Sequence, residues 1–191
     1  PGRPEDVREL SGDMIESVDR ANRWITELVH VAQAPQLHPQ SLDLVALVKT
    51  CLQEMAGELA RRGIQLHVEP GGALPVLAHS ATLRQALLSI IANAAEAMPH
   101  GGRLEVGWSQ GPSGLSGVYL VDNGVGLSPE AQSRLFQPFS SSKVGGLGMG
   151  LALVKRMVEQ WRGELLVTPE HPRGTRVEIH LPTVPGAAQG N

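Results

Sequence analysis

The chain has 191 residues, the length of one ordinary domain with a short additional segment. Hydrophobic residues make up 41% and aromatic residues 3%, so we expect a core of aliphatic side chains and alanine. The net charge of −3 and the lack of a stripe of Lys and Arg argue against nucleic acid as a partner. The single cysteine, Cys51, excludes an internal disulfide framework and a cysteine-rich metal site.

Residues 5–33 have the apolar spacing of one long amphipathic helix. Apolar side chains return every three or four positions, as on the seam of a helical bundle or coiled coil; they are Leu10, Met14, Val18, Ala21, Ile25, Leu28 and Ala32. A helix packed on its own domain is the alternative. Because the seam needs a cover, self-association as a homodimer is plausible. Pro35 and Pro39 then end the helix.

The segments suggest four parts: a helical part at 1–34, a linker at 35–40, a main domain at 41–183 and a tail at 184–191. The start, Pro1-Gly2-Arg3-Pro4, has no initiator Met, so we expect further domains upstream. No stretch is long and apolar enough to cross a membrane, so we expect this chain to make no membrane contact. We expect a cytoplasmic location, whether the parent protein is soluble or anchored.

The main domain alternates between short strands and longer helices. Apolar alternation predicts strands at 41–44, 64–68, 74–78, 104–108, 118–122, 165–167 and 175–181. Helical periodicity predicts helices at 44–61, 80–98, 128–136 and 149–161, with Asp43, Ser80 and Ser128 as N-caps. Regular βαβ repetition is missing. We therefore predict a two-layer α/β sandwich, with a mixed sheet of about five strands and three helices on one face, preceded by the long helix.

Asp122 follows an apolar run and is itself followed by alternating glycines, in the sequence Asp-Asn-Gly-Val-Gly. Gly124 and Gly126 let the backbone approach a ligand closely and adopt a positive φ. The ionised Asp122 side chain offers acceptor oxygens and no donor. These features predict a binding site, although a simple hairpin turn would use similar residues.

Asn93 falls beside the apolar stripe of the predicted helix 80–98. A polar side chain on the buried side is costly unless something bonds it. It is therefore either a satisfied core amide or a ligand for Mg²⁺, which prefers oxygen donors.

Several glycines stand just before or at the start of the predicted helix 149–161, at Gly145, Gly146, Gly148 and Gly150. So many glycines lose chain entropy on ordering, which suggests a segment that orders around a ligand. The helix N-terminus behind them favours phosphate. A Walker-type P-loop is excluded because no Gly-Lys-Ser or Gly-Lys-Thr follows.

Four blocks occur in one order: Ile90–Met98, Asp122–Gly126, Leu135–Lys143 and Gly145–Leu151. They resemble the N, G1, F and G2 boxes of the sensor histidine kinase catalytic domain, above all those of the nitrogen-regulation and oxygen-sensing kinases. That domain belongs to the ATPase superfamily of gyrase B, Hsp90 and the mismatch-repair ATPases. The resemblance covers roughly residues 40–183.

The resemblance implies that ATP and Mg²⁺ are the cofactors. Asp122 would accept a hydrogen bond from the exocyclic amine of adenine, and Asn93 would hold the metal. Lys143 would neutralise the phosphates as a point charge. The remaining residues implied at the nucleotide are Gly124, Gly126, Gly146, Gly148, Gly150, Leu151 and Thr175.

The implied reaction is transfer of the ATP γ-phosphoryl to a histidine. The family's acceptor is a helical His followed by an acid, but none of the seven histidines has an acidic residue after it, and only His30 lies on the long helix. We therefore expect the acceptor on an upstream helix, with residues 1–34 as the second helix of that hairpin. The partners would be this helix, in the same kinase or its dimer mate, and a response regulator receiver domain.

Two positions depart from the family pattern. Ser89 stands where these kinases usually have a second Asn and gyrase-type ATPases have a Glu that activates water. Trp161-Arg162-Gly163 stands where His-Gly-Gly is usual. A nucleotide-binding pseudokinase or regulatory scaffold, and a gyrase- or Hsp90-type ATPase, are therefore the alternatives.

Overall fold

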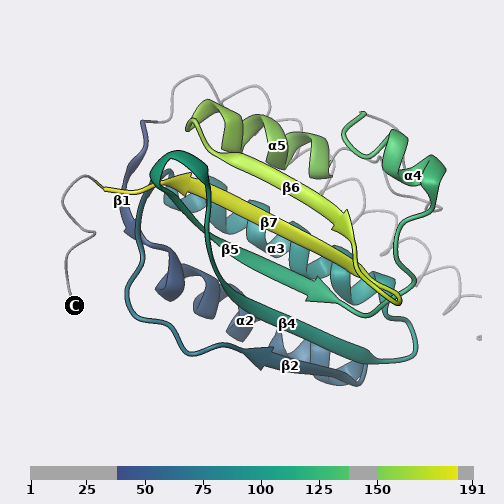
Figure 1. Cartoon of the computed structure of the whole chain (residues 1–191). Coiled ribbons are helices and arrows are strands. Elements are labelled where there is room, and N and C mark those ends of the chain that lie inside the picture. Colours follow the sequence, from purple (N-terminus) through teal and green to yellow (C-terminus); the bar gives the residue numbers. More distant parts are fainter. Residues whose placement is uncertain (1–37, 138–149, 185–191) are drawn as a thin grey trace, which may run out of the picture.

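The computed structural model describes residues 38–137 and 150–184, and Figure 1 shows their arrangement. The predicted long helix of residues 5–33 and the tail from residue 185 lie outside the described residues. The elements in chain order are β1 (Gln40–Asp43), α2 (Leu44–Arg61), β2 (Ile64–Val68), β3 (Pro75–Ala78), α3 (Ser80–Ala97), β4 (Gly102–Gln110), η2 (Pro112–Gly114), β5 (Leu115–Asp122), α4 (Pro129–Ser133), α5 (Gly150–Gln160), β6 (Glu164–Pro169) and β7 (Thr175–Pro182).

Five strands form the main sheet in the order β2-β4-β5-β7-β6. β2 runs parallel to β4, and the other neighbouring strands are antiparallel. The helices α2, α3 and α5 lie together behind this sheet in Figure 1. The predicted two-layer sandwich, with a mixed five-stranded sheet and three helices on one face, is confirmed.

The core lies between the helices and the sheet, and it is aliphatic as the composition predicts. Burying one such side chain contributes roughly 1.5–3 kcal/mol to folding. The largest fully buried side chains are Leu44, Val48, Val76, Leu83, Leu87, Ile90, Ile91, Met98, Leu104, Leu120, Ile179 and Leu181. Among the described helices, none combines the length and the apolarity that a membrane span requires.

The strands β1 and β3 form a separate antiparallel pair beside the main sheet. Asp43 joins this pair to α2, because its Oδ1 accepts hydrogen bonds from the amides of Val45 and Leu74, both at 3.0 Å. The predicted cap of the helix at 44–61 is therefore confirmed. The isolated bridge between Val76 and Thr183 connects the small sheet to the end of β7.

The cap of α3 corrects one sequence expectation. The N-cap is His79 and not Ser80, which is already helical. His79 has an extended backbone, and its Nδ1 accepts the amide of Thr82 at 3.4 Å. The pattern missed this cap because His is an uncommon residue at that position.

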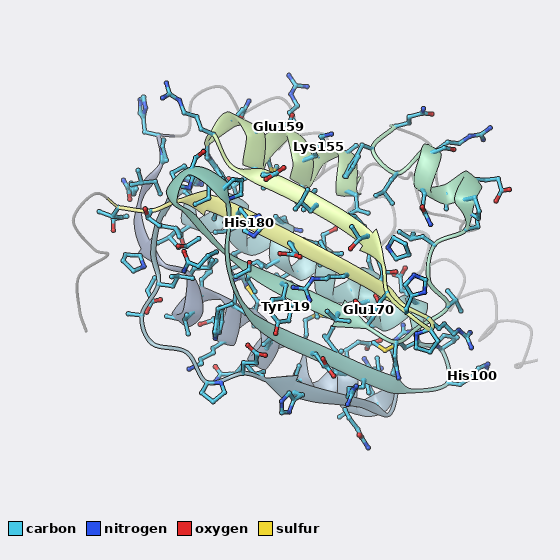
Figure 2. All side chains as sticks on the ribbon, viewed as in Figure 1. His100, Tyr119, Lys155, Glu159, Glu170 and His180 are labelled. Atoms are coloured by element: carbon cyan, nitrogen blue, oxygen red, sulfur yellow. The ribbon has the colours of Figure 1, made fainter. Side chains whose placement is uncertain are left out.

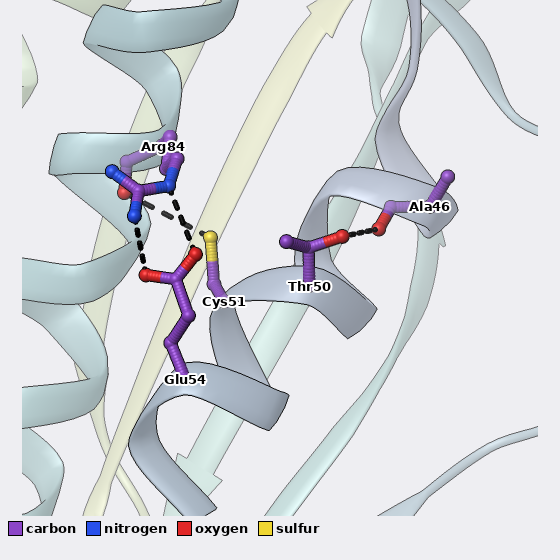
Figure 3. Close-up of polar contacts among 5 residues, drawn as sticks. All are labelled: Ala46, Thr50, Cys51, Glu54 and Arg84. Atoms are coloured by element: carbon purple, nitrogen blue, oxygen red, sulfur yellow. Dashed lines mark hydrogen bonds and ion pairs between the residues drawn. The ribbon is translucent and has the colours of Figure 1, made fainter.

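Cys51 and an ion pair lie at the contact between α2 and α3, as Figure 3 shows. The Nε of Arg84 donates to Glu54 Oε1 at 3.1 Å, and the Cys51 thiol points at the Arg84 carbonyl at 3.9 Å. Burial, reinforced by the nearby Glu54 charge, raises the pKa of Cys51 to about 11. The thiol therefore stays protonated near neutral pH and acts as a small apolar side chain in the core.

The face of the sheet opposite the helices carries a network of polar side chains (Figure 2). The Tyr119 hydroxyl donates to Glu69 Oε1 at 2.6 Å, and the Arg176 guanidinium lies 4.1 Å from the centre of the Tyr119 ring. Arg176 Nε also donates to Glu178 Oε1 at 2.7 Å. Beside this group, His180 Nε2 lies 2.9 Å from the Ser109 hydroxyl.

Candidate functional site

Asp122 lies at the C-terminal end of β5, between the two neighbouring strands of the sheet. The register pairs it with Leu104 of β4 and with Thr175 of β7. Alternation along β5 turns Asp122 to the same side as the buried Val118 and Leu120, which is the helix side. The residue is only 5% exposed. Its Oδ1 accepts a hydrogen bond from the amide of Gly124 at 2.9 Å.

The glycines after Asp122 bring the backbone against the end of α3. A Cβ on Gly124 would lie 2.4 Å from the carbonyl oxygen of Ala97, so no side chain fits there. The amide of Val125 donates to that same carbonyl oxygen at 3.0 Å. Gly126 has a φ of +74°, which a side chain would strain. The space that a Gly124 side chain would fill is occupied by the end of α3, and the predicted approach to a ligand stays a prediction.

Asn93 lies on α3, one helical turn before Ala97, and it is half-buried. Ala97, one turn further along α3, contacts the Asp122–Gly126 segment, so Asn93 and Asp122 belong to adjoining elements. Within residues 38–137 and 150–184, the side-chain amide of Asn93 has no hydrogen-bond partner. A half-buried amide can bond water or a ligand.

The connection between β6 and β7 closes the site on the other side of Asp122. Thr175 begins β7 and is buried directly beside Asp122 in the register. A Cβ on Gly174 would lie 1.9 Å from the Asp122 carbonyl oxygen, and its φ is +128°. Only glycine allows this contact. Gly174 and the predicted site residue Thr175 thus support the strand end that carries Asp122.

The remaining predicted residues lie between α4 and α5 or at the start of α5. Lys143, Gly146 and Gly148 lie outside the described residues, so their predicted roles stay predictions. Gly150 begins α5, and Leu151 is half-buried on that helix. Phe136 packs against the core, and the Lys155 ammonium lies 4.3 Å from the centre of its ring.

A hollow of about 390 Å³ lies at the same end of the sheet but on the uncovered face. Its walls come from the ends of β4 and β5 and from the connection between β6 and β7. The lining residues are Arg103, Glu105, Val121, Asp122, Asn123, Glu170, His171, Pro172 and Arg173. Asn93 does not line it. Asp122 borders this hollow, whereas the sequence predicts the ligand on the helix side of that residue.

Among the described residues no group of His, Cys, Asp and Glu could hold a metal ion by itself. In proteins, Mg²⁺ is often held by few protein groups together with substrate phosphates.

The sequence pattern of the histidine kinase-, DNA gyrase B- and HSP90-like ATPases matches residues 78–185. The chain belongs to this ATPase family. The matched region begins at the end of β3 and contains Asn93, Asp122, Gly124 and Thr175. The predicted family and its ATP-binding domain fold are therefore confirmed.

Relatives and solved structures agree with this family. The chain is 30% identical over 178 residues to the sensor histidine kinase ZraS of Escherichia coli strain K12, covering 93% of this chain and 38% of ZraS. It superimposes on full-length ShkA in complex with AMPPNP with a TM-score of 0.75 and 25% identity, covering 92% of this chain and 38% of ShkA. It also shares the fold of histidine kinase ThkA in complex with response regulator protein TrrA, with a TM-score of 0.80, 17% identity, and coverage of 97% of this chain and 54% of ThkA.

The chain spans about two fifths of the length of the curated relatives, 38% of ZraS. The part it shares with them is the ATPase-family domain and some preceding sequence. The activity, substrates and partners of a whole protein therefore have to be argued separately from the family.

Sequence reasoning missed two contributors to the site. The carbonyl of Ala97 joins α3 to the Asp122 segment, and no side-chain pattern marks a backbone acceptor. The Asn123 side chain bonds the backbone of β4, with its Oδ1 2.8 Å from the Arg103 amide. A turn-forming residue such as Asn after a strand was the one available signal for it.

Proposed function

We propose that the chain is the ATP-binding catalytic domain of a two-component sensor histidine kinase. One observation carries the proposal: the buried Asp122 carboxylate lies on the helix side of the sheet, held by Gly124 and by the end of α3. Such a carboxylate offers only acceptors. It can therefore take a hydrogen bond from the exocyclic amine of adenine, whereas guanine would present a carbonyl at the same position.

The side-chain oxygen of Asn93 is proposed to bind Mg²⁺ at the same site. The half-buried amide has no partner among the described residues, and amide oxygen is a suitable donor for this ion. Bound Mg²⁺ would supply neutralisation of the phosphate charges. The contribution of the chain is to orient the nucleotide through Asp122 and to hold the amide oxygen of Asn93 near the phosphates. Lys143 and the amides of Gly146, Gly148 and Gly150 are proposed to bind the phosphate oxygens, with Leu151 and Thr175 lining the nucleotide.

The proposed acceptor of the γ-phosphoryl group is a histidine on an upstream helix, in the same kinase or its dimer mate. Residues 1–34 are proposed to form the second helix of that hairpin and residues 35–40 the linker. The proposed downstream partner is the receiver domain of a response regulator. The relatives support this reading, since ZraS is a sensor histidine kinase and the ThkA complex contains a response regulator.

A titration with ATP tests the nucleotide part of the proposal. Calorimetry with ATP and Mg²⁺ should give one site per chain, with GTP bound much more weakly. Asp122→Asn should weaken ATP binding by about 10- to 100-fold, because a hydrogen bond to a charged group is lost. The folded loop should persist, since the Asn oxygen can still accept the Gly124 amide.

Glu178→Gln is the matched control, because it makes the same carboxylate-to-amide change on the uncovered face. The Glu178→Gln variant should bind ATP with the same affinity as the wild-type chain. Asn93→Ala should remove the part of the affinity that depends on Mg²⁺ and leave binding in excess chelator unchanged. Equal ATP affinity of the wild-type chain and Asp122→Asn would contradict the proposed adenine contact.

Transfer is tested with a longer protein that carries the upstream helix. Labelled ATP should phosphorylate that protein on histidine, and Asn93→Ala should abolish the labelling. The Ser89 position favours transfer over hydrolysis, because a serine one turn before Asn93 is a poor general base. Steady ATP hydrolysis without an acceptor would indicate the gyrase- or Hsp90-type alternative. Binding without transfer would indicate the pseudokinase or scaffold.

A further inference from the structure

The side chain of Asn123 lies where β5 leaves the sheet. The ladder between β4 and β5 ends at the pair Leu104 and Asp122. One residue further, the main-chain amide of Asn123 donates to the Arg103 carbonyl oxygen at 3.3 Å. In return, the main-chain amide of Arg103 donates to the side-chain Oδ1 of Asn123 at 2.8 Å. In a regular antiparallel pair the second bond would go to the main-chain carbonyl of residue 123. The side chain therefore replaces a backbone acceptor.

The neighbouring Gly102 leaves the space for this side chain. A Cβ on Gly102 would lie 2.5 Å from Asn123 Oδ1 and 2.6 Å from the sulfur of Met98. Apart from the bond to Arg103, the Asn123 side chain has no hydrogen-bond partner among the described residues. The residue is exposed, so this bond, and not core packing, is the main contribution of its side chain.

The replacement changes the path of the main chain directly after Asp122. With the Arg103 amide satisfied by a side chain, the backbone can turn from β4 toward α3 without leaving that donor unpaired. The next two amides then bond in new directions. Gly124 donates to Asp122 Oδ1 at 2.9 Å, and Val125 donates to the Ala97 carbonyl oxygen at 3.0 Å.

We propose that Asn123 is a positioning residue for the adenine contact of Asp122. It fixes the turn on the β4 side while Ala97 fixes it on the α3 side, so the carboxylate keeps one orientation. The inference rests on the proposed function, because it concerns how the nucleotide-binding carboxylate is oriented. It assigns to Asn123 no contact with the nucleotide.

The test compares two substitutions of the same residue. Asn123→Ala removes the acceptor, whereas Asn123→Asp keeps an oxygen that can accept the Arg103 amide. We expect Asn123→Ala to weaken ATP binding by about three- to tenfold and to lower the preference for ATP over GTP by a similar factor. Asn123→Asp should restore both to about the wild-type values. Arg103→Ala is the control, because it removes the guanidinium and keeps the backbone amide.

Hydrogen exchange supplies a readout that does not depend on nucleotide. The Arg103 amide should exchange faster in Asn123→Ala than in the wild-type chain and in Asn123→Asp. If Asn123→Ala does not fold, Asn123→Ser serves instead, since its shorter side chain cannot reach the Arg103 amide. Unchanged ATP affinity and ATP-over-GTP preference in the folded variant would overturn the inference and leave the proposed function intact. A wild-type chain that binds no ATP would overturn the proposed function, and the inference with it, whatever the exchange rates are.

Discussion

The two faces of the sheet differ in the charged side chains that they carry. On the uncovered face, Tyr119, Glu69, Arg176 and Glu178 bond one another, with each acid beside a hydroxyl or a guanidinium. The covered face is aliphatic almost throughout. Among the buried residues of the described chain, Asp122 is the only acid.

Removing a carboxylate from water costs free energy, which its hydrogen bonds and other contacts must offset. On the uncovered face, solvent and neighbouring cations reduce that cost. Asp122 stands on the covered face, at the end of the central strand, where its Oδ1 accepts the Gly124 amide, and the function proposed above adds adenine as a further donor. The following predictions test that contrast, beginning with the largest expected effect.

The first prediction concerns apolar packing on the two faces. Leu87 of α3 is fully buried, whereas Leu166 of β6 is 38% exposed. Leu87→Ala should lower the free energy of unfolding by about 2–5 kcal/mol, because it leaves a cavity. Leu166→Ala should change it by less than about 0.5 kcal/mol. Urea unfolding measures both, and equal losses would mean that the helices do not make the core.

The second prediction concerns the backbone contact behind Asp122. Gly124→Ala places a methyl group against the Ala97 carbonyl, and we expect a loss of about 1–3 kcal/mol of stability from the overpacking. Gly57→Ala is the control. Nothing lies within 4 Å of a Cβ on Gly57, and alanine in a helix interior should stabilise the chain by about 0.5–1 kcal/mol. Thermal unfolding of both variants decides whether the contact at Gly124 is as close as described.

The sequence predicts the fold well because helices and strands follow local periodicity. The stripe of Leu44, Val48 and Leu52 fixes α2, and alternation around Asp122 fixes β5. The four sequence blocks also predict the family. The sequence could not predict that Gly124 packs against Ala97, since a contact between a turn and a distant helix end has no local pattern. The cap by His79 was missed for a related reason, because the bond depends on the backbone turn that His79 adopts.

The third prediction concerns the polar network of the uncovered face. Tyr119→Phe removes the hydroxyl bonded to Glu69 and should cost about 0.5–1.5 kcal/mol at neutral pH. The hydrogen bond to Glu69 raises the pKa of Tyr119 above its usual value of 10.0. The protonated phenol is therefore favoured in the folded state, so the stabilisation is complete below pH 10.0 and is lost as the pH rises further. The difference in unfolding free energy between the wild-type chain and Tyr119→Phe should therefore shrink as the pH rises above 10.0. A difference that stays constant at all pH values would contradict the hydrogen bond.

The last prediction has the smallest effect near neutral pH and concerns the covered side. Cys51 is fully buried, and its pKa is raised from 9.0 to about 11. Iodoacetamide should modify the native chain at pH 7.5 only as fast as the chain opens, whereas the urea-unfolded chain should react at once. Because the folded state favours the neutral thiol, wild-type stability relative to Cys51→Ala should be constant below pH 9.0 and fall as the pH approaches about 11. Fast labelling of the native chain would show that the contact between α2 and α3 does not bury the thiol.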